Sequence, residues 1–367
     1  MKKHLLTNFL TILTVFMMST MIVFANGSVE GNMTSSEFLA KSNSQGDITL
    51  SDNVALSDAL KINGTDYTID LNGHTLTLTK DSNYLTNGAN VTFKNGTMIL
   101  DKIKGHADCI LGVGDYGSSA NLTLNQVTLQ ASNYTSPYAL IYVYNDSTLN
   151  IENNSVLNAK NEKSLSGGVI KTNAGKNGKI NITDSTLNFQ NTARGFLDGT
   201  INIKDSTVNM KGLSNGINTT AEGLDLTIDH SKLTITESLG RALTVDGTNI
   251  NIKNNSVVDL SHSVEGDIRF KNSGKIQVDQ SSELNFKTVK LDDRGMDLGN
   301  LIASEKYDYQ LDDQGNVIKI EKPITPETDM PDTGDETNLS LMIGMALIST
   351  IGLLYFKKTT PKKTVAK

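Results

Sequence analysis

The sequence has no tryptophan, only four arginines and a single cysteine among its 367 residues. One cysteine, Cys109, excludes an intrachain disulfide, so the fold has to be stabilised by an extensive core or by repetition. Cys109 lies in the short apolar segment HADCILGVG, which is typical of a buried, unreactive thiol. Residues 26–320 contain no long apolar run, so the segments able to meet a membrane lie at the two ends of the sequence.

The first 25 residues have the three parts of a signal peptide. Lys2 and Lys3 form a positive start, residues 5–24 are mostly apolar, and Ala25 ends the run before the polar Asn26. We expect cleavage between Ala25 and Asn26, and therefore export. An uncleaved N-terminal anchor is the alternative.

A second apolar stretch, residues 339–356, carries no charge and is followed by the basic tail 357–367. At about 1.5 Å per residue, it is just long enough to span a bilayer. The lysines of the tail keep that end cytoplasmic by the positive-inside rule.

The pentapeptide upstream of this stretch is Met330, Pro331, Asp332, Thr333 and Gly334. Pentapeptide, apolar stretch and basic tail together resemble the Leu-Pro-x-Thr-Gly sorting signal of Gram-positive surface proteins; Met replaces a Leu of similar volume. The resemblance implies that a sortase cuts between Thr333 and Gly334 and joins Thr333 to peptidoglycan. The membrane then holds the chain only before sorting, and the mature protein is extracellular and covalently anchored to the cell wall.

Removal of both ends makes the chain more acidic. Basic residues fall from 33 to 26 and acidic residues from 40 to 38, which leaves a net charge of about −12. Such a surface argues against nucleic acid and anionic wall polymers as partners, and it also favours solubility.

The central residues repeat a pattern in which two short alternating segments flank a turn. The pattern is apolar, any, apolar, any, Asn or Asp, Ser or Asn, Thr or Ser, apolar, any, apolar. INITDSTLNF (180–189) and INIKDSTVNM (201–210) fit it at every position, and seven further copies fit it less closely. Alternation with a period of two places Ile180 and Ile182 on one face, and the central polar residues favour a turn.

A repeat period in the twenties, with short strands and no helical pattern, predicts an all-β fold. We expect a single-stranded, right-handed parallel β-helix of about ten rungs with three strands per rung, because stacked coils bury the apolar face that one coil leaves exposed. Residues 168–173, 194–199 and 241–247 supply third strands. A β-sandwich is the alternative.

The expected domain organisation runs from a signal peptide to a sorting signal. It comprises a signal peptide at 1–25, an N-terminal segment with a capping helix at 26–44, the β-helix at 45–290, a C-terminal cap with a hairpin at 291–321, a linker at 322–329 and the sorting signal at 330–367, divided into 330–334, 339–356 and 357–367. The capping helix is expected over residues 34–41 with Ser35 or Ser36 as N-cap. The hairpin is expected over residues 307–320 around Asp-Gln-Gly-Asn.

Residues 48–79 contain the run Thr-Ile-Asp-Leu-Asn-Gly-His-Thr-Leu and are followed by NVTFKNGTMIL at 90–100. This part of the chain resembles the pectate-lyase-like adhesive domain of bacterial surface proteins, over roughly residues 45–290. The resemblance implies a right-handed β-helix displayed outside the cell and a role in adhesion.

Candidate catalytic patterns are better explained as structural. Asp184 and Asp205 occupy equivalent positions on adjacent rungs, where paired carboxylates could act on a glycoside. His230 and Asn254 continue the same series, however, which is typical of a turn position. GVGDYG (112–117) matches the nucleotide-binding G-x-G-x-x-G, but a strand is expected after it where that motif needs a helix.

The histidines show no paired ligand spacing. We therefore expect no catalytic residue, no cofactor and no metal in this chain.

A polar stripe is one candidate for ligand contact. It comprises the outward residues Asn150, Asn181, Asn202 and Asn251. These amides suit either hydrogen bonds to sugars or an ordinary solvated strand face.

The segment SPYALIYVYND is the second candidate. Alternation puts Ala139, Ile141 and Val143 inward, and the outward residues are then Tyr138, Leu140, Tyr142 and Tyr144. A row of tyrosines suits contact with a sugar or a protein. The alternative is a sheet surface covered by a neighbouring loop such as 160–168.

These features predict a wall-anchored, non-catalytic adhesin whose β-helix contacts a glycan or a host or bacterial surface protein. Its processing partners would be a sortase and peptidoglycan. An extracellular β-helix polysaccharide lyase or hydrolase and a structural wall component are the alternatives.

Overall fold

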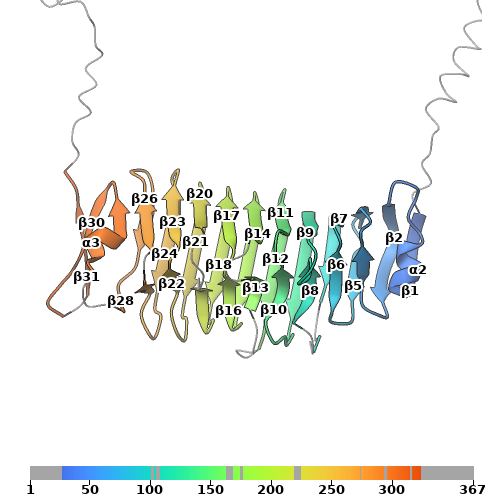
Figure 1. The fold of residues 1–367 in the computed structure, drawn as a ribbon, viewed down its shortest axis with the longest axis horizontal. Coiled ribbons are helices and arrows are strands. Elements are labelled where there is room, and N and C mark those ends of the chain that lie inside the picture. Colours follow the sequence, from blue (N-terminus) through green and yellow to red (C-terminus); the bar gives the residue numbers. More distant parts are fainter. Residues whose placement is uncertain are drawn as a thin grey trace, which may run out of the picture. The chain divides into compact units, whose positions relative to one another are not determined.

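The computed structural model describes residues 27–323, apart from 101–102, 105–107, 163–167, 174–176, 219–224, 273, 293–295 and 315, and without the side chains of 27–30. In this part of the chain, short parallel strands stack turn upon turn along one axis (Figure 1). The expected all-β parallel solenoid is therefore confirmed. Its right-handed sense stays a prediction.

Each turn contributes strands to three arms. The first arm contains β4 (Tyr67–Asp70), β11 (Thr148–Glu152), β14 (Lys179–Thr183), β17 (Thr200–Lys204), β20 (Asp225–Asp229), β23 (Asn249–Lys253) and β26 (Lys275–Val278). The second arm contains β5 (Thr75–Leu78), β12 (Val156–Lys160), β15 (Thr186–Gln190), β18 (Thr207–Lys211), β21 (Lys232–Thr236), β24 (Val257–Ser261) and β27 (Glu283–Asn285). Four longer strands pass through both arms: β1 (Gly27–Met33), β2 (Asp47–Leu56), β7 (Asn90–Ile99) and β9 (Asn121–Ser132).

The third arm is a separate sheet of ten strands, which matches the expected ten turns. These strands are β3 (Lys61–Asn63), β6 (Asn83–Thr86), β8 (Cys109–Val113), β10 (Ala139–Val143), β13 (Gly168–Thr172), β16 (Arg194–Leu197), β19 (Asn215–Asn218), β22 (Leu243–Asp246), β25 (Ile268–Lys271) and β28 (Val289–Leu291). The third strands expected at 168–173, 194–199 and 241–247 correspond to β13, β16 and β22.

One hydrophobic core runs through the stacked turns. Equivalent residues of successive turns pair directly, so that Ile180 lies beside Ile201 and Ile182 beside Ile203. All four are buried, as the alternation predicts. Complete burial of one such side chain stabilises the fold by about 1.5–3 kcal/mol relative to leaving it exposed.

A stack of buried serines follows the bend between the first and second arms. Ser206 accepts a hydrogen bond through Oγ from the backbone N–H of Ser185 at 3.1 Å, and Ser231 accepts one in the same way from Ser206 at 3.0 Å. Ser256 continues the series at 3.1 Å. The stack satisfies backbone donors that the bend would otherwise bury without a partner.

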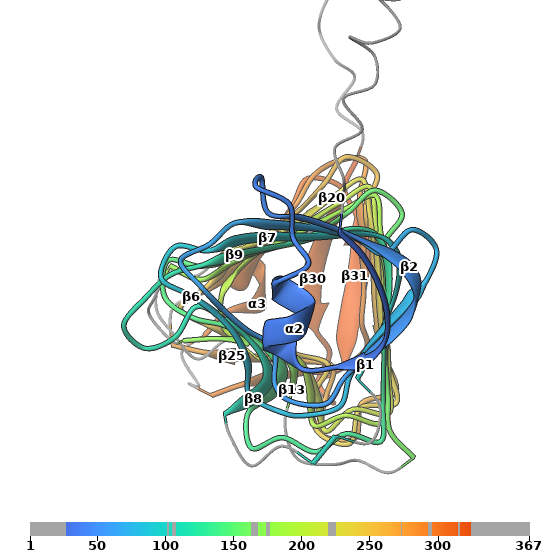
Figure 2. The same ribbon diagram turned by 90° about the vertical axis from the view of Figure 1, so that its right-hand side faces the viewer.

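The N-terminal end is closed by β1 and by helix α2 (Ser35–Leu39), which lies across the opening of the coil (Figure 2). Phe38 of α2 is fully buried in the core. The N-cap is Thr34 and not the expected Ser35 or Ser36, because Thr34 and Glu37 form a reciprocal capping box. Since β1 pairs in parallel with β2, the stack begins within the segment expected to hold only a cap.

The C-terminal end carries α3 (Leu298–Leu301), β29 (Ile302–Ser304) and the antiparallel hairpin of β30 (Tyr307–Leu311) and β31 (Val317–Glu321). The expected hairpin is therefore present. Glu283 fastens it by accepting hydrogen bonds from Lys306 at 2.7 Å and Lys319 at 2.8 Å. Burial alone would raise the pKa of Glu283, but these bonds outweigh it and lower the pKa to about 2.

Candidate functional site

The polar residues between the first and second arms form turns, as the sequence predicts. Asp184, Asp205, His230 and Asn254 have φ values between 46° and 57°, in the left-handed region where Asn, Asp and His are enriched among non-glycine residues. Asp205 Oδ1 and His230 Nδ1 lie 2.7 Å apart, with both side chains largely open to solvent. Among the described residues, no three His, Cys, Asp or Glu side chains gather as a metal site would require.

The predicted asparagine stripe is present on the outer face of the first arm. Asn150, Asn181, Asn202, Thr227 and Asn251 occupy one row of the strand register. Asn181 donates through Nδ2 to Asn150 Oδ1 at 2.9 Å, and Asn202 donates to Asn181 Oδ1 at 3.0 Å. These amides bond mainly to each other, which lengthens the hydrogen-bonded stack of the backbone.

A second ladder lies on the outer face of the second arm. Asn188 donates to Asn158 Oδ1, and Asn209 donates to Asn188 Oδ1, both at 2.9 Å. The sequence reasoning missed it, although all three residues occupy the variable position before the last apolar residue of the repeat. We call the two rows the asparagine ladders.

A row of aromatic and basic residues crosses the outer face of the third arm. The strand register brings Lys61, Tyr84, Gly112, Tyr142 and Lys171 into line on five successive turns. Further tyrosines flank this row. We name as the tyrosine cluster the residues Tyr84, Tyr116, Tyr138, Tyr142 and Tyr144.

The structure corrects the expected exposure of the tyrosine row. Tyr138 is 45% exposed, but Tyr142 and Tyr144 are only 3% and 1% exposed. Their rings nevertheless lie apart from the main core, because they form a second buried group with Cys109. Leu140, also expected outward, packs in the main core beside Ile141, so β10 departs from strict alternation at this point.

Neighbouring aromatic rings and a lysine pack against the rings of Tyr142 and Tyr144. Tyr142 and Tyr144 stack with their ring centres 4.1 Å apart, and Tyr116 meets Tyr144 edge-on at 5.2 Å. Lys171 places its ammonium 5.0 Å from the centre of the Tyr142 ring and 4.3 Å from that of Tyr138. The tyrosines therefore form a small core of their own outside the coil.

Hydrogen bonds fix the orientation of these rings. Tyr142 donates to Asn173 Oδ1, and the hydroxyls of Tyr84 and Tyr144 lie 3.4 Å apart. Tyr116 donates to Asp108 Oδ2 at 2.8 Å. This bond, followed by burial, raises the pKa of Tyr116 to about 12, while burial raises the pKa of Tyr144 above its usual value.

The G-x-G-x-x-G segment has a structural role beside the cluster. A Cβ on Gly112 would lie 2.4 Å from the ring of Tyr84, so glycine leaves the space into which this ring packs. Gly114 has φ +80°, and a Cβ there would meet Ser147 Oγ at 2.3 Å. Strand β9 follows the segment, as expected, in place of the helix that a nucleotide site would need.

Cys109 lies beneath the cluster and is completely buried. Burial raises the pKa of its thiol to about 12. Because the thiolate is the reactive form, Cys109 is unreactive at neutral pH, which agrees with the prediction from its apolar surroundings.

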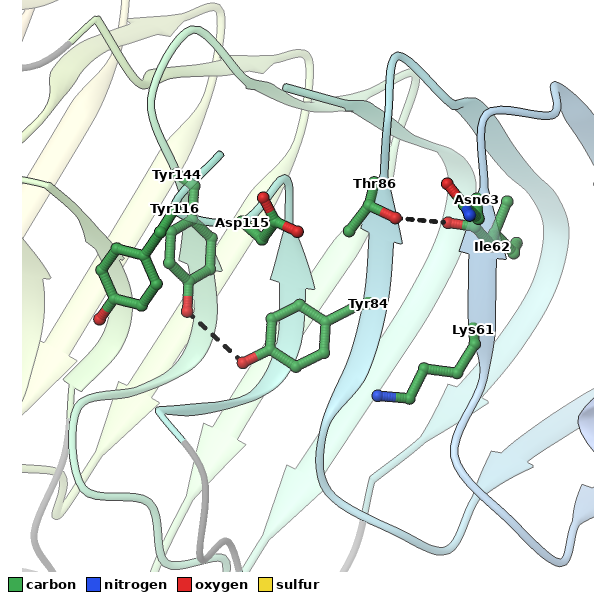
Figure 3. A pocket seen from close by; sticks show the side chains of 8 residues that line it. All are labelled: Lys61, Ile62, Asn63, Tyr84, Thr86, Asp115, Tyr116 and Tyr144. Atoms are coloured by element: carbon green, nitrogen blue, oxygen red, sulfur yellow. Dashed lines mark hydrogen bonds between the residues drawn. The ribbon is translucent and has the colours of Figure 1, made fainter. Parts of the chain in front are cut away.

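A pocket of about 400 Å³ opens at the N-terminal side of the cluster (Figure 3). Its lining residues are Lys61, Ile62, Asn63, Tyr84, Thr86, Asp115, Tyr116 and Tyr144. This volume lies at the small end of the range for ligand sites, which combine aromatic walls with a few polar groups. The sequence reasoning missed Tyr84 and Tyr116; an alignment of the third-arm segments 83–86, 109–113 and 139–143 would have placed Tyr84 in line with Tyr142.

Asp115 supplies a carboxylate to this pocket. Its Oδ1 accepts hydrogen bonds from the backbone N–H of Gly117 at 2.8 Å and from the backbone N–H and hydroxyl of Ser118 at 2.7 and 2.9 Å. Burial would raise the pKa of Asp115, but these bonds outweigh it and lower the pKa. Asp115 is therefore ionised at neutral pH, and its Oδ2 accepts no hydrogen bond from the residues that the structure describes, which leaves it available as an acceptor.

No family model, curated protein or solved structure matches this chain. In the part of the chain that the structure describes, no helix is both long and apolar enough to cross a membrane. Outside that part lie the apolar stretch 339–356 and the predicted processing residues Ala25, Asn26, Met330, Pro331, Asp332, Thr333 and Gly334.

Proposed function

We propose that this chain is a non-catalytic adhesin, exported by its signal peptide and anchored to a Gram-positive cell wall through Thr333. The anchoring half of the proposal rests on the pentapeptide, apolar stretch and basic tail of residues 330–367. The adhesive half rests on one structural observation: tyrosines of the cluster line a pocket on the outer face of the third arm. The ligand would be a glycan or a surface protein.

The anchoring half is tested by Thr333→Ala in the full chain, expressed in a Gram-positive host that has a sortase. Without the threonine side chain, the sortase should fail to position the carbonyl of residue 333 for attack, so the chain should remain in the membrane fraction, while the wild-type chain resists hot detergent extraction from the wall. Asp332→Ala, at the variable position of the motif, is the matched control and should still be anchored. Wall attachment of Thr333→Ala would overturn this half.

The adhesive half is tested with the fragment 26–329, because residues up to Lys322 form one compact unit with its own core. The fragment should bind a subset of a glycan array or of immobilised host surface proteins, and should not release reducing or unsaturated sugars from pectin or hyaluronan. Sugar release without stable binding would overturn it.

A polysaccharide hydrolase or lyase is the second candidate, and the contact between Asp205 and His230 is the observation that favours it. If turnover is found, His230→Asn should abolish it without unfolding the coil, since Asn occupies the equivalent turn position at residue 254 with the same left-handed backbone. If His230→Asn still turned over the substrate, Asp205 and His230 would not be the catalytic pair.

A further inference from the structure

We propose that the pocket beside Tyr116 binds a single pyranose ring of a glycan, with the flat C–H face of the sugar against the Tyr116 ring. This inference rests on the proposed adhesive function and assigns it to a specific site. It moves the contact from Tyr138 and Tyr142 to the neighbouring pocket, which Tyr144 also lines and where the Tyr116 ring is accessible.

The exposed aromatic wall of the pocket is Tyr116, which is 69% exposed. An exposed tyrosine normally loses side-chain freedom when a ligand orders it. Tyr116 is already held by its hydrogen bond to Asp108 and by its edge-on contact with Tyr144. The ring is therefore oriented for a ligand before binding.

Polar groups surround the aromatic surface as the rim of a pyranose requires. Lys61 places its ammonium 5.0 Å from the centre of the Tyr84 ring, at the mouth of the pocket. Asp115 offers Oδ2 as an acceptor, and Asn63 and Thr86 add an amide and a hydroxyl. A sugar ring combines an apolar face with hydroxyls around its edge, so one ring would satisfy both sets of groups.

The alternative occupants fit the pocket less well. A phosphate-bearing ligand would meet the ionised Asp115 and a net acidic protein. A purely apolar side chain would leave Lys61 and Asp115 desolvated without partners, which is unfavourable. The same repulsion by Asp115 disfavours an acidic pyranose, so a neutral pyranose is the expected occupant.

Saturation-transfer NMR on the fragment 26–329 tests the site with three probes: methyl β-glucoside, methyl β-N-acetylglucosaminide and methyl β-glucuronide, at millimolar concentration. Wild type should receive transfer from at least one probe. Tyr116→Ala should weaken that binding at least tenfold, with unchanged circular dichroism because the side chain is exposed. The two neutral sugars should bind more tightly than the glucuronide, whose carboxylate would face the ionised Asp115.

Tyr138→Ala is the matched control, because Tyr138 is an exposed member of the same cluster that does not line the pocket. It should bind as wild type does. Full binding by Tyr116→Ala, an equal loss in Tyr138→Ala, or no binding of any probe by wild type would overturn the pocket assignment.

Adhesion of cells that display the full chain separates this failure from failure of the adhesin proposal. If adhesion depends on the chain but not on Tyr116, only the pocket is wrong. If removing the chain leaves adhesion to glycans, host cells and bacterial surfaces unchanged, the adhesive function itself is wrong.

Discussion

The asparagine ladders and the tyrosine cluster both lie on the outside of the coil, yet they use that position differently. In the ladders, each amide bonds to the same residue type one turn away, as Asn202 does to Asn181. In the cluster, residues from different turns and loops meet, as Tyr116 and Tyr144 do. The second ladder also lines a pocket, of about 480 Å³, but its amides bond to one another. The pocket beside the cluster instead combines aromatic rings with a lysine and a carboxylate.

The largest expected effect concerns the core that supports both surfaces. Ile182→Asp would place an unpaired carboxylate in the dry interior, which should lower the free energy of unfolding by several kcal/mol. Thr183→Asp, on the exposed neighbour in β14, should change it by less than about 0.5 kcal/mol. Urea denaturation measures both. If Ile182→Asp and Thr183→Asp were equally stable, the strand register that places Ile182 in the core would be wrong.

Within the tyrosine cluster, buried and exposed members should differ sharply. Tyr144→Ser should lower the free energy of unfolding by about 3 kcal/mol, because it empties the centre of the small outer core. Tyr138→Ser should lower it by less than about 1 kcal/mol, the scale of losing one cross-strand aromatic contact. If thermal and urea denaturation showed the two variants to be equally stable, the second core would not exist in solution.

Alkaline pH should weaken the cluster and leave the ladders unaffected. Burial raises the pKa of Tyr144 above its usual value of 10.0, so its stabilising contribution is complete below pH 10 and is lost as pH rises above it. The stability advantage of wild type over Tyr144→Phe should then shrink by up to about 1.4 kcal/mol per pH unit. Asn181→Ala removes no titrating group, so the difference in free energy of unfolding between this variant and wild type should stay constant over the same pH range.

The smallest effect belongs to the ladders. Asn181→Ala removes one amide from the series and should lower the free energy of unfolding by about 1 kcal/mol. Asn251→Ala is the matched control, because it lies in the same row beyond Thr227, where the chain of amide bonds has ended. If calorimetry found Asn181→Ala and Asn251→Ala equally stable, the first ladder would contribute no more to stability than an ordinary solvated strand face.

The sequence was sufficient to predict what repeats. Local alternation predicts the fold and the inward positions Ile180 and Ile182, and turn chemistry predicts the turn positions Asp184 and Asp205. Every copy of the repeat carries both signals. The aligned asparagines could be predicted for the same reason, although one of the two rows was overlooked.

The burial of Tyr142 and Tyr144 could not be predicted in this way. This burial depends on Tyr84 and Tyr116, which lie outside β10 in the sequence. They come close to Tyr142 and Tyr144 only because the strand register aligns three successive turns. Local alternation gave the side of the sheet correctly for these two rings, but it contains no information about what covers that side. The pocket follows from the same long-range arrangement.

The matched pairing of β14 with β17 and of β15 with β18 has a consequence for the evolution of this chain. Residues 180–189 and 201–210 are nearly interchangeable, and they occupy equivalent places in adjacent turns. Unequal recombination between the two coding segments would remove or add one whole turn and leave every remaining pair in register. Such an event would change the length of the coil by a whole turn without altering Tyr116 and its neighbours, which lie nearer the N-terminus.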